Sequence, residues 1–153
     1  MLLTEILTPQ RVKVPLESTT RDGVIAELVD LLGIADKAER DKVLAAVLER
    51  ERIRTTGIGN GIALPHGKCA AVKELAMAVG KPAAPVDFQS VDGKPVTVIF
   101  LLVSPMDKTG PHIQALARIS RLLSFDAVRH KINTAADAEQ LFEAIKAQEE
   151  AKT

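Results

Sequence analysis

The sequence has no tryptophan and no tyrosine, and aromatic residues make up only 3% of its 153 positions. Proteins that bind single-stranded nucleic acids stack the bases on aromatic side chains. Nucleic-acid binders also carry an excess of basic residues, whereas this chain has 20 basic and 20 acidic ones. These absences argue against a nucleic-acid partner.

Cysteine and long apolar runs are also scarce. Cys69 is the only cysteine, so the chain can form no internal disulfide, which suits a reducing cytoplasm. The longest apolar run, Val98 to Val103, is far shorter than the ~20 residues that cross a bilayer. The N-terminus has no basic stretch followed by an apolar core, so it does not read as a secretory signal. We therefore expect a cytoplasmic protein without direct membrane insertion.

The length predicts one domain over residues 1–153, with a frayed polar tail from about residue 148. Helical apolar spacing is found over 24–32, from Ala35-Asp36 to near Ile53, and from Gly110-Pro111 to Leu123, with Ile113 among the residues expected to point inward. The run from Thr134 to Asp137 resembles a capping box and is expected to start the last helix. Strands are expected over 75–80 and 96–103, and the second is nearly all apolar, as in a strand covered on both faces. Strands interleaved with helices indicate an α/β domain with helices on both faces of one sheet.

The segment from Thr55 to Lys68 reads TTGIGNGIALPHGK. Its alternating glycines and apolar residues fit one half-buried strand, which Pro65 would end because proline lacks an N–H. A dinucleotide fingerprint and a P-loop both fail, since each needs a glycine where the chain has Ile62. His66, held between Pro65 and Gly67, is instead a candidate for chemistry.

Two further residues are expected near His66. His112 follows the most apolar strand and lies in the first turn of a helix, where free N–H groups and the dipole attract anions. Arg50 lies three residues after Val47, on the core-facing side of its helix, although such an arginine can also simply cover apolar surface. His130 is expected to be a surface residue, and Arg52 and Arg54 are expected either to cover apolar surface or to be solvated.

The run from Gly59 to Gly67, GNGIALPHG, resembles the active-site segment of the type 2 IIA proteins of the bacterial phosphotransferase system. This family includes fructose, mannitol and nitrogen-regulatory IIA proteins. The resemblance covers nearly the whole of the present chain, and it is strongest toward the nitrogen-regulatory branch. It implies a single-domain mixed β-sheet sandwiched between helices. It also implies that His66 is phosphorylated, with His112 and Arg50 as the other active-site residues, and that no metal or cofactor is needed.

The implied function is that of a phosphotransferase component and not of a stand-alone turnover enzyme. An HPr-like phosphocarrier would donate the phosphoryl group to neutral His66, while Arg50 and His112 would stabilise its oxygens. Regulatory target proteins or a IIB component would be the next partners. The chain has no room for a IIB or a membrane part, which favours a free-standing regulator.

Several alternatives stay open at this point. One is a separate fructose- or mannitol-type IIA component. Another is a binding regulator that is never phosphorylated, although the presence of His66, Arg50 and His112 argues against it. A zinc site formed by His66, Cys69 and His112 lacks an evident fourth ligand. A hydrolase is weaker, because Ser104, Ser120 and Ser124 lack a nucleophile-elbow context.

Overall fold

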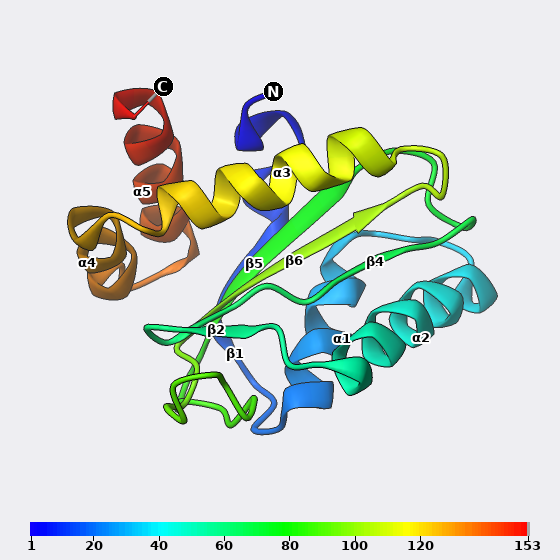
Figure 1. Cartoon of the computed structure of the whole chain (residues 1–153), viewed down its shortest axis with the longest axis horizontal. Coiled ribbons are helices and arrows are strands. Elements are labelled where there is room, and N and C mark those ends of the chain that lie inside the picture. The colour runs from blue at the N-terminus through cyan, green and yellow to red at the C-terminus, as the bar shows by residue number, and fades with distance from the viewer. Residues whose placement is uncertain (153) are drawn as a thin grey trace.

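The structure, a computed structural model, describes residues 1–152 and places helices on both sides of a mixed β-sheet (Figure 1). Two 3₁₀ turns, η1 (Leu3–Glu5) and η2 (Pro9–Arg11), precede the first strand. The strands are β1 (Val12–Leu16), β2 (Gly57–Gly59), β3 (Ile62–Ala63), β4 (His66–Lys68), β5 (Ala76–Pro82) and β6 (Val98–Ser104). The helices are α1 (Arg21–Leu31), α2 (Lys37–Ile53), α3 (Thr109–Leu122), α4 (Asp126–Thr134) and α5 (Ala138–Ala151).

The sheet is organised around β6. Its strand order is β1-β5-β6-β3-β2, and β4 also pairs with β6 beyond the end of β3. Strand β6 runs antiparallel to β5 but parallel to β3 and β4, so the sheet is mixed. The α/β fold class predicted from the sequence is confirmed.

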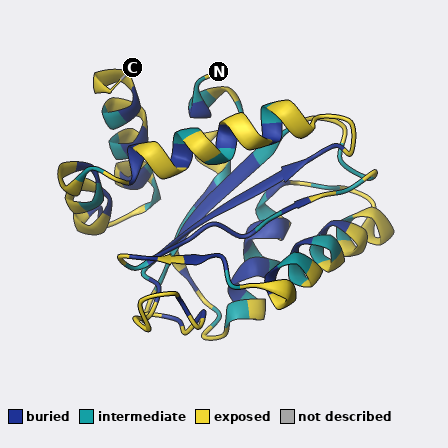
Figure 2. Ribbon diagram, viewed as in Figure 1, coloured by how far each residue is buried: buried dark blue, intermediate teal, exposed yellow. Residues whose placement is uncertain are grey.

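Alternate residues of β6 pack into two different cores. Val98 and Phe100 join the core under α3, α4 and α5, whereas Ile99 and Leu101 join the core under α1 and α2. All seven residues of β6 are buried, and Figure 2 shows the sheet as a buried layer between exposed helix surfaces. This explains why the sequence of β6 is almost continuously apolar.

The helix boundaries follow their capping residues. Thr20 Oγ1 accepts a hydrogen bond from the Gly23 N–H at 3.1 Å, and Gly33 ends α1 with a φ of 73°. Asp36 caps α2 in the same way, accepting from the Glu39 N–H at 3.1 Å. Asp137, and not Thr134, caps α5.

Helix α5 continues to Ala151, across the stretch where the sequence predicts a frayed tail. Glu149 is only 3% exposed, and its carboxylate accepts hydrogen bonds from the Leu3 N–H and from Arg118 Nε, both at 2.7 Å. The carboxylate therefore ties η1, α3 and α5 together.

The prediction that Ile113 points inward is wrong, since its side chain is 60% exposed. The buried stripe of α3 consists of His112, Ala115, Ile119 and Leu122. These residues have helical spacing, but His112 takes the core position that apolarity alone would assign to its neighbour. The buried face of α3 therefore includes a polar residue, which is why the apolar pattern alone predicted the wrong face.

The glycine segment is not one strand. Strands β2 and β3 form an antiparallel hairpin whose turn residues, Asn60 and Gly61, have φ angles of 57° and 77°. Two consecutive positive φ angles are typical of a type I′ turn, which asparagine followed by glycine favours. Pro65 interrupts the ladder, as expected, but pairing with β6 resumes at His66.

Within residues 1–152, no helix combines the length and the apolar character needed to cross a membrane.

Candidate functional site

His66 is the first residue of β4, and the packing around this short strand sets its direction. His66 pairs with Leu102 and Gly67 pairs with Val103 of β6. Helix α2 packs so closely against Gly67 that a Cβ added there would lie 3.3 Å from the Val47 backbone nitrogen. His66, on the opposite face of the strand, therefore points toward α3.

The position of the proton on His66 follows from one hydrogen bond. Its Nδ1 lies 2.7 Å from the Leu64 carbonyl oxygen. A carbonyl can only accept, so Nδ1 carries the hydrogen and Nε2 keeps its lone pair. Burial lowers the pKa of His66, and the nearby Arg50 charge lowers it further, against the opposing effects of the Leu64 hydrogen bond and Glu51. The ring is therefore neutral near pH 7, with Nε2 as its nucleophilic atom.

His112 lies beside His66. The two ring centroids are 5.6 Å apart and the ring planes are tilted by 57°. His112 is only 6% exposed, and its Nδ1 lies 2.5 Å from the Ser104 hydroxyl oxygen at the end of β6. Burial lowers the pKa of His112 to about 4, with smaller contributions from His66 and Lys68. The structure thus brings together the two histidines that the sequence singled out.

Arg50 approaches the site from the last turn of α2. Its Nη1 donates to the Arg54 carbonyl at 2.8 Å, and its charge lowers the His66 pKa. The guanidinium is therefore electrostatically coupled to His66. Arg52 and Arg54 are exposed, as expected from the sequence.

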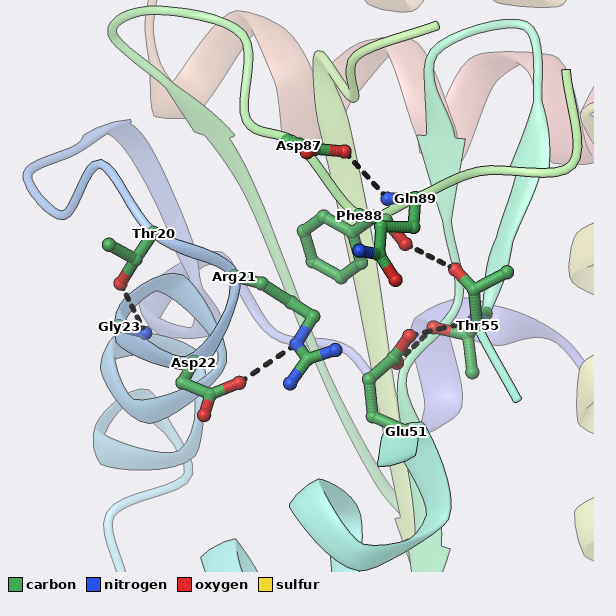
Figure 3. A network of polar contacts seen from close by, with 10 residues as sticks. Thr20, Arg21, Asp22, Gly23, Glu51, Thr55, Asp87, Phe88 and Gln89 are labelled. Atoms are coloured by element: carbon green, nitrogen blue, oxygen red, sulfur yellow. Dashed lines mark hydrogen bonds and ion pairs between the residues drawn. The ribbon is translucent and has the colours of Figure 1, made fainter. Parts of the chain in front are cut away.

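Glu51 is a buried carboxylate that the sequence analysis did not single out. It is 2% exposed and accepts from the Thr56 backbone N–H at 2.8 Å and from the Thr56 hydroxyl at 2.5 Å. The neighbouring Thr55 hydroxyl donates to the Phe88 carbonyl at 2.6 Å, and Figure 3 shows Glu51 pointing toward this segment. These bonds hold the chain between α2 and β2, and the Glu51 charge raises the His66 pKa.

Lys68 adds a second cation on the His66 side of β4. It lies two residues after His66, so both side chains leave the same face of the strand. Its Nζ donates to the Thr109 hydroxyl at 3.2 Å, at the first residue of α3. No side chain caps this end of α3 within the described chain, so its first N–H groups have no side-chain partner. Arg50, Lys68 and the start of α3 together suit an anion.

Other residues considered from the sequence lie elsewhere. Cys69 packs against the core under α1 and α2, on the far face of the sheet from the two histidine rings. Among residues 1–152, no three His, Cys, Asp or Glu side chains gather as metal ligands would, so the zinc set does not assemble. His130 is exposed on α4, as expected.

The sequence of this chain is similar to those of known proteins. The model of the family described as "Phosphoenolpyruvate-dependent sugar phosphotransferase system, EIIA 2" matches residues 5–148. The fructose-specific EIIABC component of Bacillus subtilis is 36% identical over 95% of this chain, which spans only 23% of that longer protein. The nitrogen regulatory protein of Bradyrhizobium diazoefficiens is 32% identical over 93% of each chain.

Solved structures show the same fold. The crystal structure of the nitrogen regulatory protein IIA-Ntr from Neisseria meningitidis has a TM-score of 0.84 and 29% identity, covering 94% of this chain and 98% of that one. One chain of the Escherichia coli complex between mannitol enzyme IIA and phosphorylated enzyme IIB matches with a TM-score of 0.72. It covers 92% of this chain and 97% of its own length, at 16% identity.

Proposed function

The chain belongs to the EIIA 2 family of the phosphoenolpyruvate-dependent sugar phosphotransferase system, and we propose that His66 is the residue that carries its phosphoryl group. The observation that supports this proposal is the hydrogen bond from His66 Nδ1 to the Leu64 carbonyl, which leaves Nε2 unprotonated. We infer an HPr-like phosphocarrier as the donor.

In the transfer, the Nε2 lone pair attacks the phosphorus atom of a phosphohistidine on the donor. A new N–P bond forms on His66 while the donor's N–P bond breaks, and the donor imidazole keeps that electron pair. The His66 ring gains positive charge, which the Leu64 carbonyl stabilises through the Nδ1–H hydrogen bond. No proton has to leave His66 during this step, because its single proton is on Nδ1.

Arg50 and His112 would stabilise the transferred group without carrying it. Charge lies on the equatorial oxygens of a phosphoryl group in transfer, so positioned donors lower the barrier. Arg50 offers a forked pair of N–H groups, and His112 stands 5.6 Å from His66, measured between ring centroids. Lys68 adds positive charge at the same face.

The surface around the site suits a transient protein partner. Ile58 on β2, Met106 in the turn between β6 and α3, and Ile113 on α3 are 45%, 59% and 60% exposed. Signalling contacts of this kind are small and combine apolar side chains with complementary charge. Ile62 and Leu64 are buried in the core and contribute no such surface.

We further propose that the protein acts mainly as a regulator whose targets depend on its phosphorylation state. The similarity to IIA-Ntr, at 29% identity and a TM-score of 0.84, supports this role. The fructose-specific relative, at 36% identity, supports the second candidate, a sugar-specific IIA that passes its phosphoryl group to a IIB component. Incubating the phosphorylated protein with candidate IIB proteins separates the two roles, since only a sugar-specific IIA would lose its label to one of them.

The carrier function is tested by labelling with phosphoenolpyruvate, the general first enzyme and an HPr-like carrier. We expect one acid-labile, alkali-stable phosphate per chain, and none in the His66→Ala variant. His130→Ala is the matched control, because His130 is an exposed histidine on α4. Label retained in His66→Ala, or found on His112, would contradict the assignment.

A further inference from the structure

Ser104 is a fully buried residue at the end of β6 whose hydroxyl lies against the site. It is on the face of β6 that packs under α3, in step with Val98 and Phe100. The first turn of α3 places His112 directly over it, with Ser104 Oγ and His112 Nδ1 2.5 Å apart. The backbone carbonyl of Ser104 accepts from the Cys69 N–H at 3.0 Å, which holds this end of the strand in place.

The shared proton in this contact has two possible positions. If His112 Nδ1 donated to Ser104 Oγ, the serine hydrogen would need another acceptor, and within residues 1–152 the hydroxyl has no second partner. If the hydroxyl donates to Nδ1, its only hydrogen is satisfied and so is the ring nitrogen. Leaving a buried donor unsatisfied is costly, so the second arrangement is favoured.

The arrangement determines what His112 presents to His66. A neutral imidazole has one N–H, and an acceptor role at Nδ1 places that hydrogen on Nε2. We propose that Ser104 is a positioning residue that holds His112 as the Nε2–H tautomer, so that the ring donates a hydrogen bond to the phosphoryl group transferred to His66. In the opposite tautomer Nε2 would present a lone pair, which repels a phosphoryl oxygen.

Burial supports this role for a neutral ring. His112 is 6% exposed, and burial is the main cause of its lowered pKa. The positive charges of Lys68 and of protonated His66 lower this pKa further. The ring therefore does not obtain a second proton near pH 7, and Ser104 decides which nitrogen carries the single one.

The proposal rests on His66 as the acceptor, but its first test does not. The ¹⁵N chemical shifts of both ring nitrogens of His112, measured on the unphosphorylated protein, report the tautomer directly. We expect protonated Nε2 and unprotonated Nδ1 in the wild type. An Nδ1–H tautomer of His112 would overturn the proposal and leave the His66 assignment intact. Conversely, phosphate label found on a residue other than His66 would contradict the His66 assignment without changing the tautomer of His112.

The second test is kinetic. Ser104→Ala should slow phosphoryl transfer to His66 about tenfold, equivalent to about 1.4 kcal/mol, in rapid-quench time courses. In a His112→Ala background the same change should have no further effect, because the residue through which Ser104 acts is gone. An equal slowing in both backgrounds would refute the proposal.

Two further variants separate positioning from packing. Ser90→Ala is the matched control, since Ser90 Oγ is buried without a hydrogen-bond partner in the described chain, and it should leave the transfer rate unchanged. Ser104→Thr keeps the hydroxyl and should restore the Nε2–H shift signature, with thermal melts alongside. A Thr variant that melts like the wild type yet shows the tautomer of Ser104→Ala would contradict the proposal.

Discussion

The stability of the protein should depend on pH through His112. Its pKa is lowered to about 4 in the folded chain, against about 6.5 for a histidine in an unfolded one. Between these two values the unfolded chain binds the proton more tightly, so the free energy of unfolding falls as the pH falls from about 6.5 toward 4. Below about pH 4 both states are protonated and the contribution levels off.

The size of the effect follows from the same two pKa values. Each pH unit within the window corresponds to about 1.4 kcal/mol, so lowering the pH from about 6.5 to about 5 should cost about 2 kcal/mol. The residue is 6% exposed, so solvent screens this term little. His66, whose pKa is also lowered, adds a contribution of the same sign.

The assay compares urea unfolding of the wild type and His112→Gln at about pH 7.5 and about pH 5. Glutamine can still occupy the site as a hydrogen-bonding side chain but does not titrate. The variant should therefore lose about 2 kcal/mol less than the wild type over this interval, while His130→Gln should behave like the wild type because His130 is exposed. An identical loss in His112→Gln and wild type would refute the reasoning.

Two further predictions concern α2. Arg50→Ala should slow phosphoryl transfer by about 10²–10³, as removal of a preorganised donor does elsewhere, and Arg50→Lys should recover little because an ammonium lacks the planar fork. Rapid-quench assays measure the transfer rate, with Arg52→Ala as the control. A normal rate in Arg50→Ala would make Arg50 a packing residue. Gly67→Ala should lower the free energy of unfolding by about 1 kcal/mol, because the new Cβ would lie 3.3 Å from Val47. Urea unfolding measures the change. A stabilised variant would show that α2 can shift away from β4 without cost.

The layered fold could be predicted because its signals are local and periodic. The continuous apolar run of β6 matches a strand buried on both faces. The caps of α1 and α2 are Thr20 and Asp36, with Gly33 after α1, and each acts within four residues of the helix end. Signals of this range need no knowledge of the tertiary structure.

The glycine segment could not be assigned from alternation alone. Strands β2 and β3 have three and two residues, too few to establish a period. The Asn60-Gly61 pair is itself a hairpin signal, but the glycines on either side obscured it. The return of pairing at His66 depends on the position of β6, more than 30 residues later in the chain.

The sequence singles out the two histidines that the structure places side by side, but it gives no signal for their supporting contacts. His66 and His112 stand out because histidine beside proline and glycine, or at a helix start, has few packing uses. Ser104 and Glu51 give no comparable signal. Ser104 meets His112 only because the turn after β6 folds α3 back over the strand, and Glu51 meets Thr56 only where α2 ends.

The carboxylate of Glu149 has a consequence for rearranging the chain. Because it binds the Leu3 N–H, the two ends of the described chain lie next to each other, on the same side of the molecule in Figure 1. A linker of a few residues between them should therefore permit circular permutation, with new ends opened at the exposed turn around Gly93. Fusion partners attached at either end would therefore leave from the same side, where α5 meets η1.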